Sequence, residues 1–236
     1  MYLSDPTFSG VLNINKPTQI TSFDVVRQIR RITNIRRVGH CGTLDPMATG
    51  VLILLLGKAT SRSAELMSGE KSYQAEMLLG VQTDTSDITG RVIRKMCPVP
   101  IFSKDQFLSA SQKFIGEIIQ IPPLFSAVKK DGIKLYQYAR QGLPVFRPPR
   151  IINIYSIIVK EMSFPKVRFQ VTCSKGTYVR SLVEDIGKEL NCPATLSGLI
   201  REKVGTFDIA NSLDFNELIK MSSEEILKLS MNSDVK

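Results

Sequence analysis

The chain has 236 residues, of which 43% are hydrophobic, so it can bury a sizeable core as one large domain or two small ones. Its longest apolar run, Val51 to Leu56, is too short to cross a bilayer, and its first residues lack the layout of a secretion signal. The formal net charge of +9 predicts attraction to a polyanion, of which nucleic acid is the most abundant in the cytosol. We therefore expect a cytoplasmic protein that does not bind membranes.

The histidine and cysteine content argues against metal sites and against a protease-like triad. The four cysteines form no C-x-x-C motif: they are Cys41, Cys97, Cys173 and Cys192. The single histidine, His40, nearly excludes a His-based zinc site. A Ser-His-Asp triad would have to use His40, and no G-x-S-x-G motif occurs. We expect free thiols and no metal.

The N-terminal part predicts a strand followed by a basic helix. Val11 to Asn15 indicates a short strand, closed by Lys16-Pro17. Thr21, with Asp24 three residues later, is a capping box that starts a helix. Apolar residues then recur at helical spacing, namely Val25, Val26, Ile29 and Ile32. The arginines left toward solvent form either an ordinary solvated face or a strip that contacts phosphates: they are Arg27, Arg30 and Arg31, with Arg36 and Arg37 close behind.

The middle of the chain predicts two strands separated by a short helix. Val51 to Leu56, closed by Gly57, has the length of a buried strand. Lys58 to Met67 is compatible with a short helix. Tyr73 to Leu79 alternates as a half-buried strand does, with its odd-numbered residues on one face.

The remaining elements mix strands and helices without a regular βαβ rhythm. Ile118 to Pro123 is extended because of its prolines, and Leu135 to Arg140 is expected to be helical. Val167 to Cys173 alternates as a strand, and a helix follows from Val179 to Leu190. The predicted fold class is α+β.

Asp45 is the first candidate for chemistry, because its loop is unusually constrained. Glycines bound the segment from Gly39 to Gly50, and Pro46 pushes Asp45 away from the helical region. A stiff loop is how a catalytic carboxylate is presented. Taken alone, the same segment also fits a β-turn in which Asp45 only bonds nearby backbone.

Three further segments carry weaker signals. Arg180 is either a surface arginine in a loop or, near a helix start where a cation opposes the helix dipole, a residue that needs Asp45 or a phosphate as its partner. Tyr73 either stacks on a base or fills the core. The acidic run containing Asp84 and Asp87 either binds a cation or is a plain turn, which Gly90 favours.

Taken together and in order, the motifs resemble those of the bacterial tRNA pseudouridine-55 synthase family, commonly called TruB. They cover most of the chain from Gly10 to about Phe207, and the most specific is the Gly39 to Gly50 segment. The others are Gly10-Val11-Leu12 through Lys16-Pro17, Lys71-Ser72-Tyr73, Gly80 through Asp87 to Gly90, Gln120-Ile121-Pro122-Pro123 with Ser126-Ala127, Lys134-Leu135-Tyr136 with Tyr138-Ala139-Arg140, and Cys173 to Arg180.

The resemblance implies a pseudouridine synthase fold, with a mixed, mostly antiparallel central sheet flanked by helices and loops. It implies that uridine 55 in the T arm of tRNA is flipped out and isomerised to pseudouridine without a cofactor or metal. The implied catalytic residues are Asp45, Tyr73 against the base, and Arg180 paired with Asp45. We expect a monomer.

The resemblance also implies substrate contacts or support from His40, Lys16 and Leu199. To these we add Tyr178, from the same motif as Arg180, and Arg36 and Arg37 as phosphate contacts.

Two features depart from the family pattern. Gln19 stands where the family usually has glycine, so we expect a different turn there. The family usually continues into a small RNA-binding domain of the PUA type, and this chain ends too soon to hold a complete one. We therefore expect a catalytic domain over residues 1–221 and a polar tail over 222–236.

Two other functions remain open at this stage. A non-catalytic protein that binds or folds tRNA would share the basic charge but would need no role for Asp45. A metal-dependent phosphohydrolase would use Asp84 and Asp87. For the synthase itself, the sequence leaves open whether Asp45 attacks C1′ of the ribose or assists loss of the C2′ proton.

Overall fold

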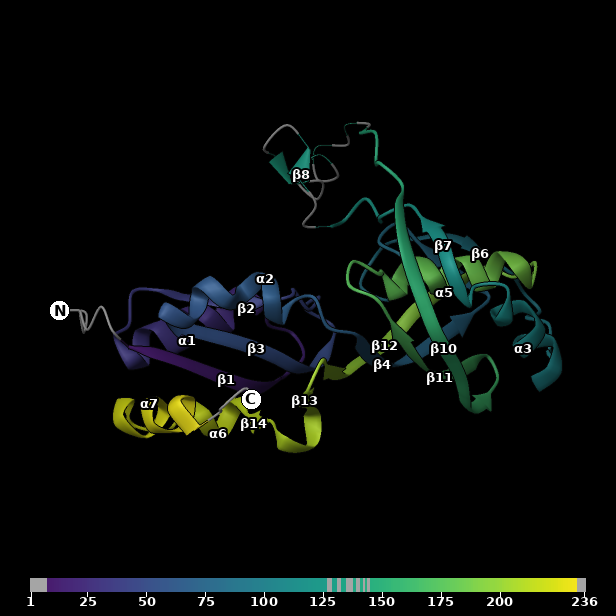
Figure 1. The fold of residues 1–236 in the computed structure, drawn as a ribbon. Coiled ribbons are helices and arrows are strands. Elements are labelled where there is room, and N and C mark those ends of the chain that lie inside the picture. Colours follow the sequence, from purple (N-terminus) through teal and green to yellow (C-terminus); the bar gives the residue numbers. More distant parts are fainter. Residues whose placement is uncertain are drawn as a thin grey trace. The chain divides into compact units, whose positions relative to one another are not determined.

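The computed structural model describes residues 8–126, 129–130, 133–134, 138, 141, 143 and 145–232. The chain divides into two compact units, the first formed by Met1–Ser72 with Ile200–Lys236 and the second by Tyr73–Leu199. Each unit contains strands and helices of its own (Figure 1). The predicted helical segment Leu135 to Arg140 lies outside the described residues, apart from Tyr138.

The strands of the first unit are arranged around β3 (Thr49–Gly57). β3 pairs antiparallel with β1 (Ser9–Lys16) and β2 (Val38–Cys41), and parallel with the end of β12 (Ala194–Val204). β14 (Leu213–Asp214) runs parallel to β1, and β13 (Phe207–Asp208) runs antiparallel to β12. Every residue from Val51 to Leu56 is at most 1% exposed, so the predicted buried strand is confirmed.

Helix α1 (Ser22–Thr33) begins at the predicted capping box. The Thr21 side chain accepts from the backbone N–H of Asp24, and the Asp24 carboxylate accepts from the N–H of Thr21. Arg30 differs from the expectation of a solvated side chain, because its guanidinium donates to the carbonyl of Val38 at 3.0 Å. This contact ties α1 to β2.

The C-terminal segment adds helices to the first unit. After the short helices η2 (Ile209–Asn211) and α6 (Phe215–Leu218), helix α7 (Ser223–Asn232) packs on β1 and α1 (Figure 1). Ile226 is fully buried and Ser230 is 2% exposed. Part of the segment that we expect to be a polar tail is therefore an ordered helix.

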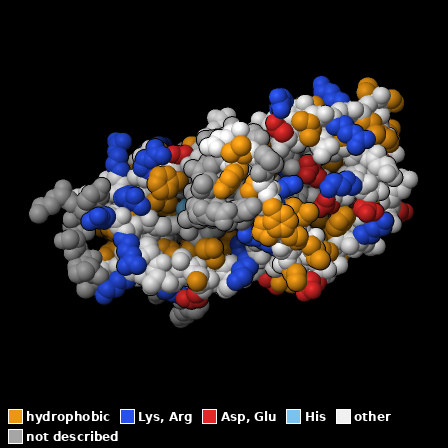
Figure 2. Space-filling model, turned by 90° about the horizontal axis from the view of Figure 1, so that it is seen from above, with side chains coloured by type: hydrophobic (Ala, Val, Ile, Leu, Met, Phe, Trp, Pro, Cys, Tyr) orange, Lys and Arg blue, Asp and Glu red, His pale blue; other side chains and the backbone are white. Residues whose placement is uncertain are grey.

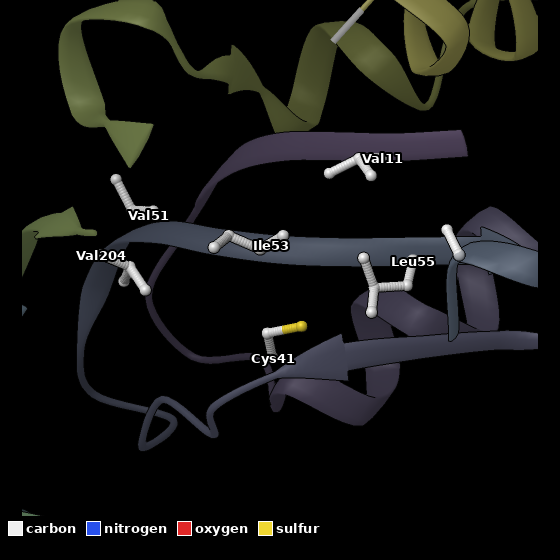
Figure 3. Packing of buried hydrophobic residues seen from close by; sticks show 7 residues of the cluster. Val11, Cys41, Val51, Ile53, Leu55 and Val204 are labelled. Carbon is white, nitrogen blue, oxygen red and sulfur yellow. The ribbon is translucent and has the colours of Figure 1, made fainter. Parts of the chain in front are cut away.

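A cluster of apolar side chains fills the space between the strands of the first unit and η1 (Lys58–Arg62), which leads into α2 (Ser63–Leu66). The buried members are Val11, Cys41, Val51, Ile53, Leu55, Ala59 and Val204. Figure 3 shows Cys41 at the end of β2 and Val51 near the start of β3. The two ends of the loop that carries Asp45 are thus anchored in the core.

The second unit contains a sheet in which β4 (Lys71–Leu79) lies between β12 and β11 (Lys166–Cys173). β10 (Arg150–Ser163) pairs antiparallel with β11 on one side and with β7 (Gly116–Gln120) on the other. The odd-numbered residues of β4 from 73 to 79 are all buried, as predicted from their alternation: they are Tyr73, Ala75, Met77 and Leu79.

Helices α3 (Lys104–Gln112) and α5 (Val179–Glu189) contact each other, and α3 also contacts β10. The ring of Phe107 in α3 lies 6.1 Å from that of Phe169 in β11, measured between centroids. The short strands form two hairpins, β5 (Val81–Thr83) with β6 (Val92–Lys95) and β8 (Lys129–Lys130) with β9 (Ile133–Lys134).

The predicted α+β class with a mixed, mostly antiparallel sheet is confirmed, because most strand pairs among the described residues are antiparallel, while β1 with β14 and β3 with β12 are parallel. Among the described residues, no helix is both long and apolar enough to cross a membrane.

Gln19, which stands where the family usually has glycine, has a left-handed backbone with φ of 69°. Its side chain is exposed, so glycine would lose little burial there and would relieve the strain. We expect Gln19→Gly to raise the free energy of unfolding by about 0.5–1 kcal/mol, measured by urea denaturation. The matched control is Gln28→Gly in the exposed interior of α1, which should lower it by about 1 kcal/mol. Equal losses in both variants would contradict the strain argument.

Candidate active site

Asp45 opens a tight turn that is hydrogen-bonded on both sides. The N–H of Ala48 donates to the carbonyl of Asp45 at 3.0 Å, with Pro46 at the second position of the turn, which proline favours. The N–H of Gln19 donates to the carbonyl of Pro46 at 2.8 Å. The half-buried Asp45 is therefore held in a defined backbone, as expected from the sequence.

Ser22, the first residue of α1, joins this loop to the helix. Its Oγ accepts from the N–H of Leu44 at 2.8 Å and donates to the carbonyl of Leu44 at 3.1 Å. Leu44 itself is 3% exposed. The residue before Asp45 is thus fixed by both backbone polar groups and by a buried side chain.

Two buried cations beside the loop lie on the two strands that flank β3. Lys16 on β1 pairs with Gly50 on β3, and Gly50 pairs with Arg201 on β12, so the three residues stand at one level of the sheet. Lys16 is fully buried and Arg201 is 1% exposed. Burying two like charges is costly unless negative groups compensate, and a nearby ionised carboxylate does so.

The Lys16 ammonium donates to the carbonyls of Pro17 and Ile20 at 2.7 and 2.9 Å. Burial lowers its pKa from the ordinary value of 10.5 to about 8, against the opposing charges of Asp45 and Asp24 and with help from Arg201. Lys16 therefore lies within the electrostatic reach of Asp45, consistent with the supporting role expected for it.

The lowered pKa of Lys16 has a consequence for stability. Between about pH 8 and 10.5 the unfolded chain holds a proton on Lys16 that the folded protein has released, so stability rises with pH in this window. We expect the wild-type protein to gain stability relative to Lys16→Met across this range, measured by urea unfolding. Lys58→Met, at an exposed site, should follow the wild-type curve. Parallel curves for wild type and Lys16→Met would contradict the expectation.

The basic side chains predicted to contact phosphates are mostly exposed in the first unit. Arg31, Arg36 and Arg37 are exposed, and Arg27 lies over the Phe23 ring at 5.6 Å and pairs with Asp24 at 2.9 Å. Figure 2 shows Lys and Arg side chains spread over the visible surface. His40 lies on β2, opposite Leu54, and is half-buried.

In the second unit, Arg180 makes a buried ion pair that sequence reasoning missed. Its Nη1 lies 3.6 Å from Asp87 Oδ2, and the two residues are 3% and 5% exposed. Arg180 also donates to the carbonyls of Thr85 and Phe125, both at 2.9 Å. Arg180 is therefore not a surface side chain, and the acidic turn supplies a partner for it.

Gln120 caps helix α5 at Tyr178, which has no side-chain cap of its own. The N–H of Tyr178 donates to Gln120 Oε1 at 2.8 Å, and Gln120 Nε2 donates to the carbonyl of Tyr178 at 3.1 Å. Gln120 is 2% exposed. The segment that carries Tyr178 and Arg180 is thus fixed against the end of β7.

The predicted site residues fall into two groups. Asp45, Lys16, His40, Arg36 and Arg37 belong to the first unit, and the rest belong to the second: Tyr73, Tyr178, Arg180 and Leu199. Tyr73 is 7% exposed and Leu199 is 8% exposed. The pair of Asp45 with Arg180 joins residues of different units and stays a prediction.

The four cysteines are free, as predicted. Burial raises the pKa of Cys41, which ends β2 just before the loop, to about 11. This thiol therefore stays protonated at neutral pH.

Residues 30–179 match the model of the TruB family pseudouridylate synthase, N-terminal domain. The fold is accordingly that of a pseudouridylate synthase, which is an isomerase. The chain is 49% identical over 210 residues to "tRNA pseudouridine synthase B" of Dehalococcoides mccartyi strain CBDB1, covering 89% of this chain and 69% of that one. It is 46% identical over 219 residues to the protein of the same name from Clostridium tetani, covering 93% and 75%. The chain belongs to the TruB family.

Among solved structures, "Crystal Structure of a Cbf5-Nop10-Gar1 Complex" superposes with a TM-score of 0.70 at 31% identity. The match covers 93% of this chain and 60% of that one, so the chain spans about three fifths of that protein's length. The family resemblance drawn from the motifs is confirmed.

Proposed function

We propose that the chain converts uridine 55 in the T loop of tRNA to pseudouridine, with the base flipped out and Asp45 as the essential carboxylate. Membership of the TruB family and relatives named tRNA pseudouridine synthase B support this proposal. The observation that carries it is a carboxylate in a hydrogen-bonded turn beside two buried cations, Lys16 and Arg201.

The reaction is a redox-neutral isomerisation. The bond from C1′ of the ribose to N1 of uracil breaks, the base turns, and a bond forms from C1′ to C5. The C5 proton then leaves, and N1 ends with a proton. Positive character on the ribose needs an ionised carboxylate, either as a nucleophile at C1′ or as a base toward the C2′ proton. Neighbouring positive charges favour the ionised form of Asp45.

The remaining predicted residues bind the RNA or support Asp45. Leaving the stack costs the uridine a few kcal/mol, and stacking on Tyr73 returns about 1–3 kcal/mol. Arg180 pairs with Asp45, while His40, Tyr178 and Leu199 line the position of the flipped nucleotide. Arg36 and Arg37 bind phosphates and fix the register of the T arm without reading its sequence. In this proposal residues 1–221 act as the catalytic domain.

The phosphohydrolase alternative loses support from the contacts of its two aspartates. Asp87 Oδ1 accepts from the hydroxyl of Thr85 at 2.9 Å and the N–H of Thr89 at 3.0 Å, while its other oxygen faces Arg180. Asp84 accepts from the N–H of Arg91 at 2.8 Å. Their oxygens are engaged within the protein.

The test is to incubate the purified chain with an unmodified tRNA transcript and to map pseudouridine at nucleotide resolution. We expect a single modified position, 55, with the same rate in the presence of a chelator. A transcript with cytidine at position 55 should bind equally well and give no product. Tight binding without pseudouridine would favour the tRNA-binding alternative, and loss of activity with chelator would refute a metal-independent reaction.

A further inference from the structure

Arg201 makes an unusual set of contacts for a buried cation. Its Nη2 donates to the carbonyl of Gly42 at 3.0 Å, its Nη1 to that of Thr43 at 3.4 Å, and its Nε to that of Val51 at 2.7 Å. All three acceptors are backbone oxygens. Within the described part of the chain, no carboxylate lies within ion-pair distance of this guanidinium.

These contacts join the two ends of the loop that carries Asp45. Gly42 and Thr43 enter the loop three and two residues before Asp45, and Val51 follows it at the start of β3. One planar guanidinium therefore links the residues that precede Asp45 to the residue that begins the buried part of β3. The five donors of arginine are arranged in a fork, so the three carbonyls are held in one fixed geometry, which a single ammonium cannot reproduce.

The backbone of Arg201 meets the same loop at Gly50. Gly50 pairs with Arg201 and has φ of 103°, and a Cβ on it would lie 2.2 Å from the Arg201 carbonyl oxygen. Strand β12 therefore contacts the loop with both its main chain and its guanidinium. The close approach explains the glycine at position 50.

The charge of Arg201 also acts on the groups around the loop. It adds to the lowering of the Lys16 pKa that burial causes, and it opposes the rise that burial causes in the pKa of Cys41. A residue needed only for packing would not require a buried charge, because removing a cation from water is costly.

We propose that Arg201 is a positioning residue for the isomerisation: its guanidinium holds the Gly42 to Val51 loop so that Asp45 is presented in one orientation. This proposal rests on the proposed function of Asp45. Arg201 acts through the loop and does not itself touch the substrate.

The experiment compares Arg201→Lys and Arg201→Met with the wild-type chain in single-turnover pseudouridine formation and in tRNA binding. Displacing a catalytic group by about 1 Å costs about 100-fold in rate, so we expect Arg201→Lys to lose about that factor with its tRNA Kd within threefold. Arg201→Met, without a charge, should lose more. The matched control is Lys203→Met on the same strand, an exposed side chain paired with Asp208, which should behave as wild type.

Hydrogen exchange supplies a readout that does not depend on activity. The amide of Leu44 donates to Ser22 of α1, and that of Ala48 donates to the carbonyl of Asp45. In Arg201→Lys both should lose protection at least tenfold while those of β1 keep theirs. If the wild type forms no pseudouridine, the proposed function fails, and exchange alone decides the role of Arg201. Unchanged loop protection, an unchanged rate, or loss of the folded state in both variants would overturn the proposal.

Discussion

Asp45→Asn is expected to abolish pseudouridine formation while leaving tRNA binding unchanged. The amide has nearly the same shape as the carboxylate, and the turn that it opens is held by the backbone bond from Ala48, so the loop should keep its conformation. Only the charge is lost, and with it the ability to attack C1′ or to remove a proton. Loss of one essential catalytic group lowers the rate by about 10⁴-fold or more.

The measurement is release of tritium from tRNA labelled at C5 of uridine, under single-turnover conditions. The matched control is Asp24→Asn, at a second carboxylate whose charge reaches Lys16 and which caps α1. This control should lose stability of about 1 kcal/mol but keep its activity. Product formation by Asp45→Asn within tenfold of the wild-type rate would remove Asp45 from the mechanism.

Arg180→Met is expected to lower the free energy of unfolding by about 3–5 kcal/mol, because it leaves a buried carboxylate without its cation. Asp87 is 5% exposed, and the carbonyls of Thr85 and Phe125 lose their donor in the same step. The change is measured by urea denaturation, with circular dichroism as the signal.

The double variant Arg180→Met with Asp87→Asn separates stability from catalysis. Neutralising Asp87 should restore part of the lost stability, since no charge is then buried alone, while activity should stay low because the cation is still missing.

The matched control is Arg168→Met, which removes an exposed cation paired with Glu76 and should lower the free energy of unfolding by less than about 1 kcal/mol. A double variant that recovers full activity would reduce Arg180 to a purely structural role.

Most of the fold could be predicted from local patterns. The capping box at Thr21, the run from Val51 to Leu56 and the alternation of β4 each depend on neighbouring residues, and each is confirmed. The C-terminal helix α7 could not be predicted, since only a few of its side chains, Ile226 among them, are buried in a polar segment. Packing against β1 and α1 decides its structure, and that contact is distant in sequence.

The candidate site was predictable where its residues are constrained locally. Asp45 stands between glycines and before Pro46, so the sequence alone predicts that its loop is constrained. The contacts of Arg201 with the loop and the pair of Asp87 with Arg180 were missed because the partners lie 159 and 93 residues apart, respectively. The residues around Arg201, from Leu199 to Val204, do not alternate between apolar and polar, so no local pattern marks Arg201 as buried.

The hydrogen bonds that hold the Asp45 loop also bear on whether Asp45 or the uracil moves during the proposed reaction. The loop is bonded to Ser22, to Gln19 and to the guanidinium of Arg201, so Asp45 has little freedom to follow its target. In the proposed mechanism, the free uracil therefore makes the turn that exchanges N1 for C5, while the carboxylate of Asp45 stays in place. In this proposal the protein loop keeps its conformation, and only the RNA rearranges.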